Sequence, residues 1–146
     1  MIFTFGHYKI DIDLEKTKAF YDSEVIEHPC TCISCRNFQK AIAYLPSDIK
    51  NFFGNLGIDI RKEAEVSSSH TKENGRILYS GFYHLCGTIL DSGTEEQHFK
   101  FFKILDGFAI CFQSKCDLLE KDFPMPAIQL EFALDVPWVL SEENPF

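Results

Sequence analysis

The chain has 146 residues, with 14 lysines and arginines against 22 aspartates and glutamates, so its formal net charge is −8 at pH 7 with neutral histidines. A surface of this sign repels nucleic-acid phosphates, and no basic cluster offsets it locally, so nucleic acid is not expected as a partner. The 45% of hydrophobic residues, 15 phenylalanines among them, supply a core, and the length predicts one domain spanning residues 1–146.

The start of the chain carries no targeting signal that we recognise. Residues 1–7 have no basic leader and no long apolar run, so no signal peptide is predicted. No window approaches the roughly 18 apolar residues of a membrane span, so no membrane association is expected and we predict a cytoplasmic protein. Thiols stay reduced in that compartment, so the six cysteines do not imply disulfides.

The first element predicted is a strand. Apolar and charged residues alternate over residues 8–15, which is the period of a strand with one face on a core. The residues expected to point inward are Tyr8, Ile10, Ile12 and Leu14. Polar residues and a proline over residues 22–29 then predict a connection.

Two amphipathic helices are predicted next, over about residues 34–45 and 47–56, because apolar side chains recur there at helical spacing. A proline separates them. Ser34 and Ser47 are the predicted N-caps, since their hydroxyls can accept from an otherwise unpaired backbone N–H of the first turn. Gly57 is predicted to end the second helix in the left-handed conformation.

The remainder of the chain is expected to form strands. Residues 77–90 predict a long strand in which Gly81 and Gly87 mark bulges or close backbone approaches. Asp106-Gly107 predicts a two-residue hairpin of type I′. Residues 128–136 alternate and predict the last strand, with its polar side chains outward.

The order of these elements predicts the fold class. Residues 61–76 are polar, serine-rich and aperiodic, which predicts a loop with at most a short strand. Consecutive strands after a helical pair, without strand–helix alternation, favour an α+β fold. We expect a mainly antiparallel sheet of about five to six strands with the helical pair packed on one face.

One turn concentrates the chemistry of the sequence. Three of the six cysteines, Cys30, Cys32 and Cys35, lie within six residues and follow His28. Zinc accepts thiolate and imidazole ligands, and the spacing of Cys32 and Cys35 lets two sulfurs chelate one ion around a tight turn. These four residues are the candidate ligands, and zinc is the cofactor they would hold. Structural zinc sites normally add a second pair from a distant segment, and the other close pair, at positions 111 and 116, begins in a predicted strand.

Two other interpretations of this turn stay open. A C-x-x-C at a helix start lowers the pKa of its first thiol, which makes Cys32 an attacking thiolate and Cys35 its resolving partner, with Arg36 adding positive charge. No βαβ pattern surrounds the motif, however, and a third thiol at Cys30 invites scrambling. The structural interpretation is that the cysteines pack as small hydrophobic side chains, and it is the leading single explanation.

Outside this turn the sequence offers little chemistry. Cys86 and Cys111 lie in predicted strands, where packing explains both. His84 shares a strand face with Cys86, which favours a hydrogen-bonded core histidine. The motifs G-x-S-x-G, G-x-x-x-x-G-K-[ST], G-x-G-x-x-G and H-E-x-x-H do not occur.

We therefore expect a small acidic module that binds a protein or ligand without catalysis. One concrete form is an inhibitor or immunity-type protein whose acidic face steers it to a basic protein partner. The alternative is a zinc-binding or thiol-redox protein that uses His28, Cys30, Cys32 and Cys35.

Overall fold

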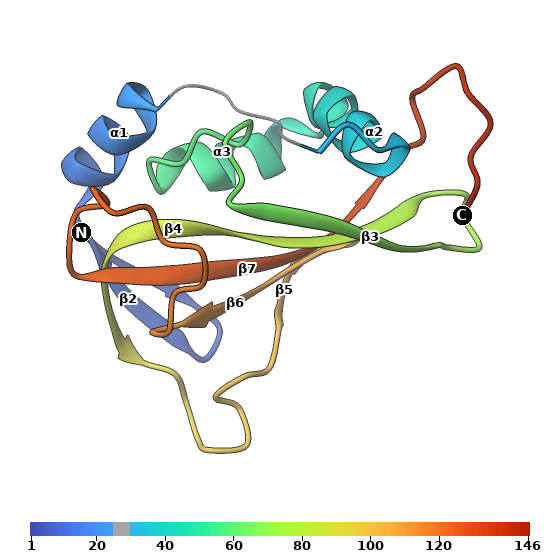
Figure 1. Ribbon diagram of the computed structural model, residues 1–146. Coiled ribbons are helices and arrows are strands. Elements are labelled where there is room, and N and C mark those ends of the chain that lie inside the picture. Colours follow the sequence, from blue (N-terminus) through green and yellow to red (C-terminus); the bar gives the residue numbers. More distant parts are fainter. Residues whose placement is uncertain (25–29) are drawn as a thin grey trace.

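The computed structural model describes residues 1–24 and 30–146 (Figure 1). Its elements are β1 (Ile2–Phe5), β2 (Tyr8–Ile12), α1 (Leu14–Ser23), α2 (Ile33–Ala41), the 3₁₀ helix η1 (Ile42–Tyr44), α3 (Ser47–Asn55), β3 (Glu65–Thr71), β4 (Ile77–Asp91), β5 (Phe102–Leu105), β6 (Phe108–Gln113) and β7 (Ala127–Val136). The predicted α+β class with an antiparallel sheet is confirmed, although the sheet has seven strands. None of the helices in the described ranges has the length and apolar character needed to cross a membrane.

The sheet is organised around β4, its longest strand. The strand order is β1-β2-β4-β7-β6-β5, and β3 also pairs with β4. One side of β4 pairs with β7 over residues 77–86. The other side pairs with β3 over residues 77–82 and with β2 over residues 87–91. The described pairings therefore leave residues 83–86 of β4 without a neighbouring strand on that side.

Helix α1 fills this gap with side chains. The Tyr21 hydroxyl donates to the carbonyl oxygen of His84 (2.8 Å) and accepts from the N–H of the same residue (3.1 Å). The Thr17 hydroxyl accepts from the backbone N–H of Cys86 (3.0 Å). Buried backbone groups must be paired, so two side chains of a helix do here what a strand would otherwise do.

The prediction that Leu14 belongs to a strand is wrong, because α1 begins at this residue. Asp13 is the N-cap, and its carboxylate accepts from the backbone N–H of Lys16 (3.0 Å). The buried side chains of the helix, Thr17, Phe20 and Tyr21, follow the i, i+3, i+4 spacing of one helical face.

The predicted helical pair is confirmed as α2 with η1, followed by α3, and Figure 1 shows both on one face of the sheet. Both predicted caps are wrong. Ser34 lies inside α2, whose N-cap is Cys32, and α3 follows Pro46 without a side-chain cap. The predicted end of α3 is confirmed, since Gly57 has a φ of 81° and the next N–H bonds back to the helix.

Aromatic side chains connect α3 to the sheet. Phe53 is 1% exposed, and its ring lies 5.1 Å from that of Tyr83 in β4 and 5.5 Å from that of Phe108 in β6. The ring of Phe5 in β1 lies 6.1 Å from that of Phe112 in β6, although these strands are far apart in the sheet order. The sheet therefore curls. Figure 1 shows the β1-β2 and β5-β6 hairpins at its two ends, both below β4 and β7 in that view.

Three further expectations concern the strands. The stretch 61–76 contains the seven-residue β3, so the expectation of a loop with at most a short strand was too weak. The hairpin at Asp106-Gly107 is confirmed, but only Gly107 has a positive φ (79°), so the turn is not type I′. In β7 the apolar residues expected to point inward are buried, which confirms that half of the prediction. The expectation that the polar residues face solvent is wrong for Gln129 and Asp135, which are 1% and 6% exposed.

The close backbone approaches predicted in β4 are confirmed. A Cβ at Gly81 would lie 2.2 Å from the carbonyl oxygen of Glu65 in β3. A Cβ at Gly87 would lie 2.2 Å from the carbonyl oxygen of Asp11 in β2. Both glycines therefore let β4 accept its two neighbours on one side.

Candidate thiolate metal site

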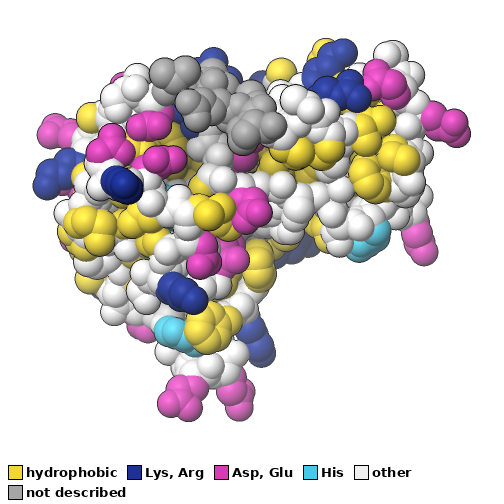
Figure 2. Space-filling view, in the orientation of Figure 1, with side chains coloured by type: hydrophobic (Ala, Val, Ile, Leu, Met, Phe, Trp, Pro, Cys, Tyr) yellow, Lys and Arg dark blue, Asp and Glu magenta, His cyan; other side chains and the backbone are white. Residues whose placement is uncertain are grey.

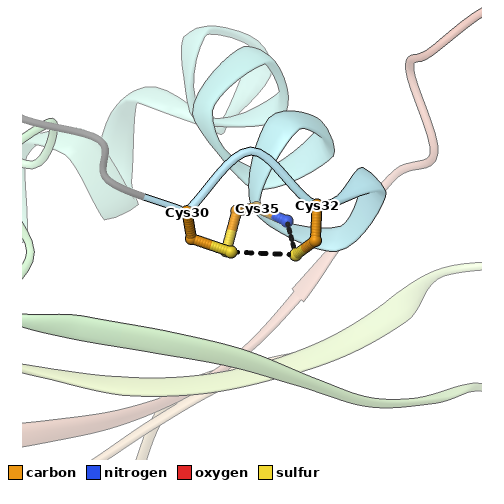
Figure 3. Close-up of side chains that lie close together, drawn as sticks. All are labelled: Cys30, Cys32 and Cys35. Carbon is orange, nitrogen blue, oxygen red and sulfur yellow. Dashed lines mark hydrogen bonds between the residues drawn. The ribbon is translucent and has the colours of Figure 1, made fainter.

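The three clustered cysteines meet at the start of α2. Cys30 and Cys32 precede the helix and Cys35 lies in its first turn. Because the chain turns into the helix here, the three side chains point to the same side of the turn (Figure 3). Their sulfur atoms all lie within 4.8 Å of one another, and the Cys30 and Cys32 sulfurs are 3.1 Å apart.

Cys32 is the N-cap of α2. Its sulfur accepts from the backbone N–H of Cys35 (3.4 Å), one of the helix-start donors without an intrahelical partner. This N–H, followed by the contact with the Cys30 thiol, lowers the pKa of Cys32 from 9.0 to about 7. The predicted direction of the pKa shift is therefore confirmed, and near neutral pH a large share of Cys32 is thiolate.

Cys35 lies in the opposite environment. Its side chain is 9% exposed and packs into the core face of α2. Burial raises the pKa of this thiol well above its ordinary value, and the hydrogen bonds with Cys30 and Cys32 raise it further. Without a nearby cation Cys35 keeps its proton. The cluster therefore combines one thiol of lowered pKa, Cys32, with one thiol of raised pKa, Cys35.

Arg36 does not serve the thiolate as expected. Its guanidinium pairs with the carboxylate of Glu142 (2.8 Å) and donates to the carbonyl oxygen of Thr31 (3.3 Å). Backbone N–H and thiol groups, and not this charge, account for the lowered pKa of Cys32.

The packing interpretation holds for some cysteines and fails for others. Cys35, Cys86 and Cys111 are buried, as that interpretation requires. Cys30 and Cys32 are exposed, so packing does not explain them. A chemical role, as a metal ligand or a nucleophile, is therefore needed to explain Cys30 and Cys32.

The predicted ligand set is placed only in part. His28 lies outside the described residues, so its role as a ligand stays a prediction. Among the residues that the structure describes, the group able to hold a metal consists of Cys30, Cys32 and Cys35. Cys111 and Cys116 do not join it, and the Cys111 sulfur instead lies 3.1 Å from the Tyr8 hydroxyl.

A cavity of about 710 Å³ adjoins the cluster, and Cys30 and Cys35 line it. Its wall also includes residues of α1, of the segment leading into β3 and of residues 118–123, with His84 from the β4 gap. The His84 ring lies 3.2 Å from the side-chain oxygen of Gln129, and burial lowers its pKa, so the prediction of a hydrogen-bonded core histidine is confirmed. No sequence pattern indicated the cavity, because segments far apart in the chain form it.

Comparison of the chain with protein-family models, with curated proteins and with solved structures found no match. The function proposed below therefore depends on the residues and their geometry.

Proposed function

We propose that this protein binds one zinc ion through the thiolates of Cys30, Cys32 and Cys35. The proximity of the three sulfur atoms carries this proposal. Ligand sulfurs about 2.3 Å from a tetrahedral zinc ion lie about 3.8 Å apart, and these three lie within 4.8 Å of one another. Small side-chain rotations are therefore enough to surround an ion.

The pKa values of the thiols agree with this role. Zinc binds the thiolate form, and Cys32 reaches that form near neutral pH because its pKa is about 7. A divalent ion next to Cys35 supplies the positive charge that lets this buried thiol ionise. Zinc binding therefore releases protons, and we expect affinity to rise with pH.

His28 is the fourth ligand that we propose, on the strength of the sequence. It stands two residues before Cys30, and three thiolates with one imidazole form a common structural zinc set. A site of this type stabilises a fold without taking part in catalysis, which agrees with a binding module.

Metal analysis of the purified protein tests the proposal. We expect one zinc per chain, and Co²⁺ added to metal-free protein should give sulfur-to-cobalt charge-transfer absorption. Cys32→Ser and Cys35→Ser should each weaken binding by more than the roughly 10–100-fold that loss of an outer-shell partner costs.

Cys116→Ser is the matched control, because this thiol lies outside the cluster, and it should leave zinc affinity unchanged. His28→Ala should weaken binding without abolishing the charge-transfer absorption. Protein that takes up neither zinc nor cobalt would contradict the proposal.

Thiol–disulfide exchange is the second candidate, favoured by the 3.1 Å contact between Cys30 and Cys32 and by the acidity of Cys32. The Cys32 thiolate would attack a substrate disulfide and release one substrate thiol. A second cysteine would then displace the other, leaving a protein disulfide and a substrate reduced by two electrons. Metal-free protein that reduces one equivalent of glutathione disulfide per chain, and turns over only when dithiothreitol is added as the reductant, would favour this candidate, and tightly bound zinc would block it.

The partner of the module is proposed from charge. The net charge of −8 favours a basic protein, since charge complementarity accelerates association. An association rate that falls steeply with added salt supports this proposal, and a salt-insensitive rate contradicts it.

A further inference from the structure

The cavity beside the cysteine turn has the dimensions of a small-molecule site. Its volume of about 710 Å³ lies within the roughly 300–1,000 Å³ typical of ligand pockets. It lies beside residues 83–86 of β4, which the described pairings leave without a neighbouring strand on one side, between α1 and the start of β3. Its position therefore follows from the sheet topology.

Aromatic side chains form one part of the wall. Phe20, Tyr21 and Phe123 all line the cavity and are each less than one tenth exposed. The rings of Phe20 and Phe123 lie 4.5 Å apart, and that of Tyr21 meets Phe20 edge to face at 5.6 Å. Mutual packing holds these rings in place, so this wall is preformed.

Carboxylates form another part of the wall. The glutamates that line the cavity are Glu24, Glu63, Glu65 and Glu120. Burial raises the pKa of Glu63 to about 7, so this side chain carries only part of a negative charge at neutral pH. Lys62 is the one lysine or arginine among the described lining residues, and its ammonium group donates to the Tyr21 carbonyl and lies 3.8 Å from the Asp59 carboxylate. His84 also lines the cavity, and burial lowers the pKa of its imidazole, which favours the neutral form. Figure 2 shows acidic and apolar side chains side by side on this face, to the left of and below the grey residues.

A zinc ion in the neighbouring site would not reverse this sign. Three thiolates and one divalent ion carry a net charge of −1 by simple addition of their formal charges. Cys30 and Cys35, which line the cavity, therefore add no positive field whether the ion is bound or not.

We infer that this cavity binds a small organic cation, a substituted ammonium group on an apolar body. Aromatic faces attract such cations through the ring quadrupole, and the carboxylates supply charge complementarity. The apolar body replaces water against the buried aromatic wall. This inference goes beyond metal binding and does not depend on it.

Two probes of opposite charge test the inference. Benzyltrimethylammonium and benzylsulfonate share a ring and a tetrahedral head group, and the quaternary nitrogen has no lone pair for a metal. Calorimetric titration of the metal-free full chain at low salt should give at least about tenfold tighter binding of the cation. Equal binding of the two probes, or no binding at millimolar concentration, would overturn the inference.

Charge reversals localise the binding. Glu65 and Glu120 are exposed lining residues, so Glu65→Lys and Glu120→Lys should fold and should each weaken cation binding by about fivefold or more. Glu73→Lys makes the same change of net charge in the turn after β3, outside the lining, and should change binding less than about twofold. An equal effect of all three reversals would show that the probe is attracted to the acidic surface as a whole. That result would contradict the assignment of the binding site to the cavity.

Discussion

Two regions of this molecule satisfy backbone groups with side chains, and they differ in burial. In the turn before α2, the Cys32 sulfur accepts from a helix-start N–H and stays exposed. In the middle of β4, the Tyr21 and Thr17 hydroxyls pair with backbone groups of His84 and Cys86 inside the protein. The first region keeps its sulfur available, whereas the second leaves no polar atom of these pairs free to react.

The comparison shows that the environment of a cysteine, buried or exposed, decides its role in this protein. Cys86 lies in the second region, 2% exposed, and burial raises its pKa. Cys32 lies in the first, where a backbone N–H lowers its pKa to about 7. The same thiol is therefore a packing group in one place and a ligand or nucleophile in the other.

The largest effect is expected from Tyr21→Phe, which breaks the buried side of the comparison. It leaves the N–H and carbonyl of His84 without their partner. Each unpaired buried group costs about 1–3 kcal/mol, so the loss of two partners should lower the free energy of unfolding by about 2–6 kcal/mol in urea titrations. Tyr44→Phe is the control, because Tyr44 is 66% exposed, and it should change little; equal stabilities for the two variants would refute the account of the β4 gap.

Cys86→Ser sharpens the comparison next. It places a hydroxyl where a buried thiol packs, and we expect a loss of about 1–3 kcal/mol in the free energy of unfolding. Cys32→Ser in metal-free protein should stay within about 0.5 kcal/mol of the parent, since Cys32 is exposed. Equal losses at the two positions would remove the contrast.

Thiol reactivity gives a third comparison. Cys32 ionises with a pKa of about 7, so iodoacetamide alkylation of metal-free protein, mapped by mass spectrometry, should reach half its maximal rate near pH 7. Burial raises the pKa of Cys86, so its alkylation should need a more alkaline medium. At pH 7 we expect about a tenfold faster reaction at Cys32, because the larger thiolate fraction is partly offset by lower intrinsic nucleophilicity. Similar pH profiles would show that the helix start does not activate the sulfur.

The smallest effect is expected from Arg36→Gln. This change breaks an ion pair with Glu142 in which both side chains are nearly half exposed, so the free energy of unfolding should change by less than about 1 kcal/mol. The alkylation profile of Cys32 should stay the same, since backbone N–H groups and the Cys30 thiol lower its pKa. A shift of that profile to higher pH would restore the role first expected for this arginine.

Local patterns predicted those parts of the fold that depend on neighbours in sequence. The α2–α3 pair, the end of α3 at Gly57 and the hairpin at Gly107 all follow from spacing and turn chemistry. Helix α1 was missed because Leu14 continues the alternation of the preceding strand, and the capping residue Asp13 resembled one more polar position. The length of β3 was underestimated, because its sequence, EVSSSHT, lacks a clear apolar face.

The candidate site also has parts that the local sequence predicts and parts that it does not. The cysteine cluster was predictable, since six residues of one turn bring its sulfurs together. The capping role of Cys32 was not, because sulfur is an uncommon N-cap and Ser34 offered the usual hydroxyl. The cavity was beyond local patterns, because α1, β3 and residues 118–123 meet only through tertiary folding.

The use of helix side chains along β4 has a consequence for solubility. If α1 detached, His84 and Cys86 would present backbone groups without partners along an apolar strand, which is a template for pairing with another chain. Tyr21 and Thr17 therefore cover an edge of β4 that could otherwise pair with another chain. How often this edge is exposed depends on the equilibrium between the docked and detached states of the ten-residue helix α1.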